Sequence, residues 1–170
     1  MRPARPGDAA EIARIQLLTW RTAYGDVIPA PALAVVDDEQ ATVQWRAAVE
    51  EAPGPAYRVL VAAEGAVTVG FAALEPDPED PAVSLVTTLL VEPRWGRRGH
   101  GSRLLAALVD HARQDGRDRL QAWLLERDKA SLGFYTSAGW ARDGWVRTLE
   151  PEGATIREVR LHTSLVEGDS

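Results

Sequence analysis

The chain has 170 residues, of which 45% are hydrophobic and 26% charged, and this size and balance predict one globular domain. Because it contains no cysteine, a disulfide scaffold, a thiolate zinc site and a cysteine nucleophile are excluded. A net charge of −6 argues against a nucleic-acid partner, since phosphate binding requires clustered positive charge.

The first third of the chain has the pattern of two helices. Asp8 followed by Glu11 resembles a capping box, and apolar residues then recur at helical spacing. This pattern predicts a helix from about Asp8 to Tyr24. A second helical stretch is expected from roughly Glu39 to Glu51, with prolines on both sides of it.

The middle of the chain has the composition of strands. Arg58–Ala63 and Val67–Leu74 are rich in Val and Ala and are separated by a short turn that contains glycine. They predict a hairpin. Val83–Val91, rich in Val, Leu and Thr, is expected to form a third strand, which Pro93 ends.

Helices and strands alternate in the second half. An amphipathic helix carries Leu104, Leu105 and Leu108 on one face. The elements expected after it are a strand, a short helix that Gly139 stops, and a closing hairpin: Leu120–Leu125, Asp128 to about Ala138, and Trp145–Leu149 with Ile156–Leu165. This order predicts one α/β domain built on a mixed sheet.

The domain is expected to span residues 1–166, with a short polar tail at 167–170. No apolar run approaches the roughly 20 residues that cross a bilayer, and the first eight residues lack the apolar stretch of a signal peptide. We therefore expect a cytoplasmic protein without a membrane segment.

The most informative segment joins the third strand to the amphipathic helix. It carries Gly96, Gly99 and Gly101 within six residues. Glycines let the backbone approach an anion closely, and a helix N-terminus presents unpaired N–H groups with a partial positive charge. Arg97 and Arg98 add formal charge, so the segment predicts a site for phosphate or pyrophosphate.

A simple glycine turn with solvent-exposed arginines is the alternative interpretation of this segment. Two other phosphate-binding loops do not fit. A Walker A loop needs Gly-Lys-Ser/Thr, whereas here Gly101 directly precedes Ser102. A dinucleotide fingerprint needs a glycine where Leu104 stands, and an early first strand.

The loop resembles that of the GNAT superfamily of N-acetyltransferases, which reads Gln/Arg-x-x-Gly-x-Gly/Ala after a Val-x-Pro-like turn. Here Gly96–Gly101 follows Val91-Glu92-Pro93, and Gly96 departs from the usual Gln or Arg. A second family motif, Asn-x-x-Ala-x-x-Phe/Leu-Tyr-x-x-x-Gly-Phe, is similar to Asp128–Trp140, with Asp and Ser replacing Asn and Ala. The N-terminal segment Trp20-Arg21-x-x-Tyr24-x-x-x-Ile28-Pro29 is similar to one that shapes the acceptor pocket in many bacterial members.

The resemblance implies a mixed, strongly twisted sheet of six or seven strands with about four helices. Two central strands, here Val83–Val91 and Leu120–Leu125, would splay apart and hold the pantetheine arm of acetyl-CoA between them. The residues that the resemblance implies at the cofactor are Leu89, Leu90, Val91, Arg97, Arg98, Gly99, His100, Gly101, Ser102, Asp128 and Tyr135. The backbone of Leu89, Leu90 and Val91 would serve as an added strand for the pantetheine amides.

The resemblance also implies that Tyr135 faces the cofactor sulfur. A phenol is protonated at neutral pH and can donate to a departing thiolate, so Tyr135 is the expected general acid. Periodicity alone would make it a core aromatic. For the general base, Glu126 is the nearest acidic candidate by motif, Glu92 and Glu75 are alternatives, and water could serve instead.

Trp20, Tyr24 and Trp123 are expected to line the acceptor site. Six tryptophans are many for this length, so some should face a pocket or a subunit interface, and a homodimer is expected. Three scattered histidines predict no metal site. The expected acceptor is an amine of a small molecule, amino acid or antibiotic. A lysine or N-terminus of a protein, or a non-catalytic acyl-CoA-binding role, are the alternatives.

Overall fold

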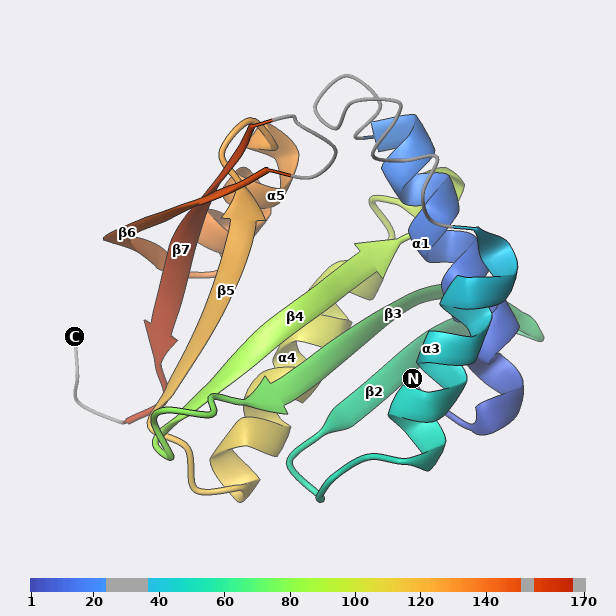
Figure 1. The fold of residues 1–170 in the computed structure, drawn as a ribbon, viewed down its shortest axis with the longest axis horizontal. Helices are drawn as coiled ribbons and strands as arrows, with labels where there is room; N and C mark the ends of the chain where they lie inside the picture. Colours follow the sequence, from blue (N-terminus) through green and yellow to red (C-terminus); the bar gives the residue numbers. More distant parts are fainter. Residues whose placement is uncertain (24–36, 151–154, 167–170) are drawn as a thin grey trace.

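One twisted sheet organises the part of the chain that the computed structural model describes, residues 1–23, 37–150 and 155–166. Its seven strands lie in the order β1-β2-β3-β4-β5-β7-β6, and only β4 and β5 run parallel (Figure 1). The strands are β1 Arg2–Pro3, β2 Arg58–Glu64, β3 Val67–Pro76, β4 Val83–Val91, β5 Arg119–Leu125, β6 Ala141–Leu149 and β7 Ile156–Ser164.

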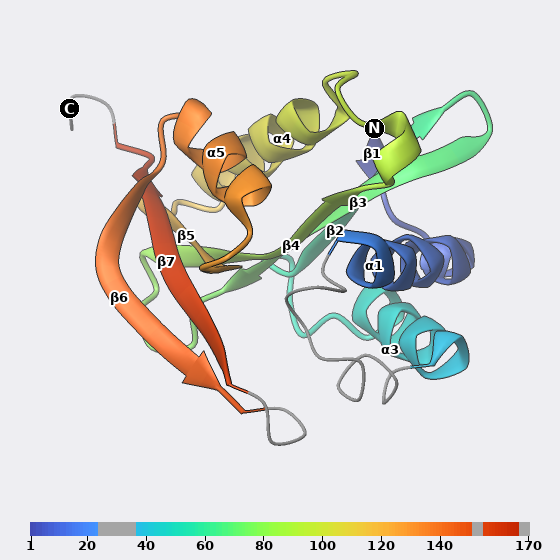
Figure 2. The same ribbon diagram turned by 90° about the horizontal axis from the view of Figure 1, so that it is seen from above.

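Helices cover both faces of this sheet (Figure 2). α1 and α3 lie on one face and α4 and α5 on the other; their bounds are α1 Ala9–Ala23, α3 Asp38–Glu50, α4 His100–Gln114 and α5 Lys129–Ser137. Two carboxylates cap helix starts: Asp37 accepts from the backbone N of Gln40 at 2.7 Å, and Asp128 from that of Ser131 at 3.1 Å. Gly139, at φ +93°, follows the end of α5 as expected.

Each layer has its own buried core. Ile12 and Ile15 of α1 pack on Phe71 and Val61 of the sheet. On the other face, the predicted apolar stripe of α4 is buried with residues of β3, β4, β5 and β7, among them Leu104, Leu108, Leu74, Leu120 and Leu161. These two cores hold α1 and α4 against opposite faces of the sheet near the end of β4.

The two central strands part soon after they meet. β4 pairs with β5 over Val83–Leu85 and Arg119–Gln121 only, and beyond this point the strands diverge (Figure 1). A register shift in the β3–β4 ladder leaves Thr87 opposite no residue, because Ala73 pairs with Thr88 and the next pair is Leu74 with Val86. Such a bulge bends a strand and increases its twist. The mixed sheet, the splayed strands and the four helices confirm the expected fold.

Some details differ from the sequence expectation. β6 begins at Ala141, earlier than expected, because a register shift around Gly144 (φ +90°) lets the strand continue past an irregular turn. The expected capping box of Asp8 and Glu11 is not what the structure has. The side chain of Asp8 accepts hydrogen bonds from Arg2 and from the backbone N of Arg5, before α1 begins. The segment around Tyr24 and the tail at 167–170 lie outside the described residues.

Candidate active site

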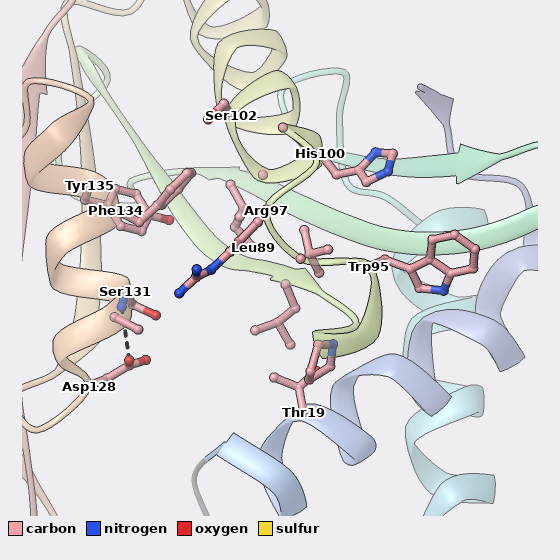
Figure 3. Close-up of a pocket in the computed structure, with 17 residues that line it drawn as sticks. Thr19, Leu89, Trp95, Arg97, His100, Ser102, Asp128, Ser131, Phe134 and Tyr135 are labelled. Carbon is pink, nitrogen blue, oxygen red and sulfur yellow. Dashed lines mark hydrogen bonds between the residues drawn. The ribbon is translucent and has the colours of Figure 1, made fainter.

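The glycine loop forms the start of α4. Gly99 is the N-cap residue of this helix and has φ +83°, a conformation that L side chains rarely adopt. Arg97 also has a positive φ, of 63°, and Figure 3 shows its side chain reaching across the cavity toward Ser131 of α5. The loop therefore directs both the N-terminus of a 15-residue helix and a guanidinium into the same space.

The three loop glycines differ in what a Cβ would meet, and only Gly99 has a positive φ. A Cβ on Gly99 would stand 2.8 Å from Nη1 of Arg103, and one on Gly101 would stand 3.4 Å from the ring of Phe134. The first of these atoms is the end of a flexible side chain and the second distance is an ordinary van der Waals contact. Gly96, at φ −67°, has backbone angles open to other residues, but a Cβ there would stand 3.2 Å from the backbone O of Pro93.

A hydrogen-bonded cluster fastens the loop to the end of β2. Arg103 Nη2 lies 3.2 Å from Nδ1 of His100, and a guanidinium can only donate, so Nδ1 accepts and Nε2 carries the hydrogen. Nε2 of His100 then donates to Oε1 of Glu64 at 2.6 Å. This hydrogen bond, with the positive charge of Arg98, lowers the pKa of Glu64. The buried His100 ring is therefore a structural anchor of the loop.

Arg98 differs from the expectation that it contacts the cofactor. Its Nη1 donates to Oε2 of Glu64 at 3.0 Å, and its guanidinium lies 5.0 Å from the ring centroid of Trp95. It does not line the pocket described below. Arg97 is the loop arginine that faces the cavity (Figure 3), and the role of the two arginines at the phosphates stays a prediction.

The backbone of β4 presents alternate residues to the gap. Glu92 N donates to Val69 O at 2.8 Å, which makes Gly70 and Val91 a non-hydrogen-bonded pair of the β3–β4 ladder. The N–H and C=O groups of Val91 therefore point away from β3 and toward the gap beside β5. The same alternation applies to Leu89, whereas the backbone of Leu90 pairs with β3, so the expectation that all three serve as an added strand is corrected.

A pocket of about 490 Å³ fills the space between the glycine loop, β4 and α5 (Figure 3). Every residue expected to hold the cofactor except Arg98 lines it. Thr19 of α1, which no sequence motif indicated, lines it too. Thr19 is 6% exposed, and its hydroxyl has no hydrogen-bond partner among the described residues.

A second pocket of about 260 Å³ adjoins the first on the side of β5 and β7. The expected acceptor residues Trp20 and Trp123 both line it. Residues shared by the two pockets are Leu89, Leu90, Asp128, Ser131 and Tyr135. The last three lie three and then four residues apart, so one face of α5 and its cap forms the boundary between the pockets.

Tyr135 combines a packed ring with a place at both pockets. It is 4% exposed and makes edge-to-face contacts with Phe134 and Trp140, with ring centroids 5.4 and 4.9 Å apart. Figure 3 shows it on the pocket side of α5, opposite the glycine loop. The core role and the site role that the sequence offered as alternatives are therefore compatible.

The acidic residues expected as possible bases lie elsewhere. Glu126 is an exposed partner of Arg157 at 3.4 Å and lines neither pocket. Glu92 is buried between Arg14 and Arg94, at 3.2 and 2.8 Å, and is also absent from both linings. Glu75 is exposed on β3.

The carboxylates at the second pocket are instead Asp128 and Glu158. The place of Glu158 follows from the strand register, which the local sequence does not specify. Alternation along β7 places it on the same face as Arg160, and antiparallel pairing with β5 places Arg160 beside Trp123.

The first pocket fits acetyl-CoA on three observations. An unpaired strand edge can bond the pantetheine amides, the N-terminus of α4 with Arg97 can hold the pyrophosphate, and Thr19 offers a buried hydroxyl without a described partner. The described residues contain no group of three or more His, Cys, Asp or Glu placed to bind a metal ion. Within those residues, no helix is both long and apolar enough to cross a membrane.

Comparison with known proteins agrees with this geometry. The model of the acetyltransferase (GNAT) family matches residues 16–140. An uncharacterised N-acetyltransferase of Bacillus subtilis is 26% identical over 167 residues, which cover 95% of this chain and 90% of that protein. A mycothiol acetyltransferase of Kineococcus radiotolerans is 30% identical over 106 residues, covering 62% of this chain but 34% of the relative.

The fold is also that of a solved structure, a provisionally assigned acetyltransferase of Salmonella typhimurium with its cofactor acetyl-CoA. It has a TM-score of 0.73 and 21% identity, and the match covers 99% of this chain and 95% of the other. The chain belongs to the acetyltransferase (GNAT) family. It is thus an N-acetyltransferase whose acetyl donor is acetyl-CoA.

Proposed function

We propose that the protein acetylates a primary amine of a small molecule, an amino acid or an antibiotic, by direct attack while donor and acceptor are both bound. One observation carries this proposal: the two pockets meet at Tyr135 and Asp128, so a donor in one and an acceptor in the other would touch. Holding two reactants together removes much of the entropic barrier to their reaction. The relative named for mycothiol is in line with a small-molecule acceptor.

Side chains and backbone groups have separate roles in binding the donor and in the transfer. Leu89 and Val91 bond the donor's pantetheine arm, and the N-terminus of α4 with Arg97 binds its pyrophosphate. Acetyl-CoA supplies an activated thioester. The amine attacks in its neutral form and gives up a proton to water as the N–C bond forms. The N–H of Val91 stabilises the developing oxyanion, and the hydroxyl of Tyr135 donates a proton to the departing thiolate and regains one from water.

The test is to incubate the protein with acetyl-CoA and a panel of small amines, amino acids and lysine peptides while free CoA is measured. We expect CoA release to depend on a small amine and initial-rate lines to intersect, as a ternary complex requires. Release with peptides alone would identify a protein acetyltransferase. Binding of acetyl-CoA by calorimetry without turnover of any amine would identify a non-catalytic acyl-CoA-binding module.

A further inference from the structure

The second pocket has a polarity that restricts its ligand. Most of its wall is apolar or aromatic, with Trp20 of α1 facing in from one side and Trp123 of β5 from another. At about 260 Å³ it lies below the range of roughly 300–1,000 Å³ that holds drug-sized ligands. The charged residues among the described lining are Asp128 and Glu158, both acidic. The pocket suits a small ligand with an apolar body and a positive group.

Glu158 is held in a fixed orientation. It lies on β7 between Leu125 of β5 and Arg147 of β6, and its side chain is 13% exposed. Nε of Arg147 donates to Oε1 of Glu158 at 2.6 Å. In the described part of the chain, the other oxygen, Oε2, accepts no hydrogen bond, and it is available to a ligand that can donate.

Arg147 is itself held by an aromatic stack on the same face. Its guanidinium lies 4.4 Å from the ring centroid of Trp123. Arg160 lies 5.7 Å from the Trp123 centroid and 5.1 Å from that of Trp145, and it pairs with Asp143 at 2.6 Å. The guanidinium groups of Arg147 and Arg160 thus contact tryptophan rings and carboxylates, and neither arginine lines the pocket. Among the described lining residues, a ligand carboxylate would meet two carboxylates, Asp128 and Glu158, and no cation.

We propose that Glu158 binds the acceptor as its ammonium ion, which gives a proton to water before the neutral amine attacks, and that the acceptors are small monoamines with an aromatic or apolar body and no carboxylate beside the amine. Asp128 lines both pockets, whereas Glu158 lines only the second, so Glu158 is the charge that belongs to the acceptor side alone. The negative charges of Asp128 and Glu158 would repel the carboxylate of an amino acid, and the Trp20 ring favours a flat apolar body. This inference rests on the proposed function and selects among its acceptor classes.

The test compares 2-phenylethylamine with L-phenylalanine, which adds a carboxylate to the same ring and amine. We expect kcat/KM to favour 2-phenylethylamine by at least about tenfold, since the carboxylates of the pocket repel the carboxylate of L-phenylalanine. Glu158→Gln should raise KM for 2-phenylethylamine by about 10- to 100-fold through loss of a charged hydrogen bond, with KM for acetyl-CoA unchanged. Glu158→Asp keeps the charge and should lose less. Asp143→Asn is the matched control, because it breaks an arginine pair on the same face but outside the pocket.

A direct titration separates this inference from the proposed function. Binding of 2-phenylethylamine, followed by tryptophan fluorescence with and without CoA, should weaken in Glu158→Gln and not in Asp143→Asn. This readout needs no acetyl transfer, whereas failure of acetyl-CoA to bind would overturn the proposed function alone. Equal affinity in the wild type and Glu158→Gln, a preference for L-phenylalanine, or equal losses in Glu158→Gln and Asp143→Asn would overturn the role of Glu158.

Discussion

Tyr135 lies where the two pockets meet, and its ring packs edge-to-face against Phe134 and Trp140. Tyr135→Phe should therefore keep the fold and the affinity for acetyl-CoA while kcat falls. General acids contribute about 10²–10⁴-fold, and a thiolate leaves well unassisted, so we expect the lower end of this range. The measurement is steady-state kinetics with single-turnover rates. A kcat within about twofold of wild type, with chemistry rate-limiting, would leave Tyr135 as a packing residue.

Glu126→Gln belongs beside that variant. Because Glu126 is exposed and lines neither pocket, its replacement should leave the rate within about twofold. Loss of activity would instead make it the base that the sequence motif suggested.

Gly99 is the loop position where backbone conformation matters most. Gly99→Ala places a Cβ at φ +83° and 2.8 Å from Nη1 of Arg103, so it should destabilise the protein by about 1–2 kcal/mol and weaken acetyl-CoA binding. Gly54→Ala is the matched control, since its Cβ would meet nothing within 4 Å and its φ is not positive. Urea denaturation and calorimetry measure the two effects, and equal behaviour of the variants would make Gly99 an ordinary turn residue.

At the scale of elements, the tether between β2 and the glycine loop depends on a charge. The pKa of Glu64 is lowered by its hydrogen bond with His100 and by Arg98, so the folded state binds this proton less readily than the unfolded chain. The stabilisation is complete above the ordinary glutamate value of about 4.3 and is lost as pH falls through the lower folded-state value. Glu64→Gln should therefore lower Tm at pH 7, and the difference from wild type should shrink at pH 3.

The same variant should weaken acetyl-CoA binding by roughly two- to fivefold, the size expected for a partly exposed ion pair. Thermal melts at both pH values and calorimetry at pH 7 measure these effects. A Tm difference that does not depend on pH would show that Glu64 acts by packing.

Elements were predictable where the signal is local. Periodicity gave α1 and α4, and the run of Val, Leu and Thr gave β4 at its observed bounds. Contacts that depend on strand register were not predictable. Glu64 meets His100 across 36 residues, and Glu158 meets Arg147 through the β6–β7 ladder. Nothing in either local sequence identifies its partner. The sequence motif was therefore enough to predict the donor pocket, whereas Glu158 in the acceptor pocket could be identified only from the folded structure.

At the scale of the whole molecule, the homodimer stays a prediction, and β6 is the surface where we expect it. This edge strand exposes Trp145, Val146 and Leu149 to 62%, 43% and 41%. A second copy would cover them and the unpaired strand edge. Light scattering at micromolar concentration should give twice the chain mass, and Val146→Lys should give one chain mass. A wild-type monomer at all concentrations would remove the prediction.

Because β4 and β5 diverge, each has an unpaired edge inside the sheet, in addition to the edges formed by the outermost strands. An interior edge is read most directly by hydrogen–deuterium exchange, because alternate amides of β4 have different partners. The amides of Leu89 and Val91 face the gap and should exchange quickly in the free protein, whereas the amide of Leu90, paired with Phe71, should exchange slowly. Acetyl-CoA should slow the first two and leave the third almost unchanged. Bound acetyl-CoA would then act as a temporary strand between β4 and β5, and the sheet would again have an open gap there once it leaves.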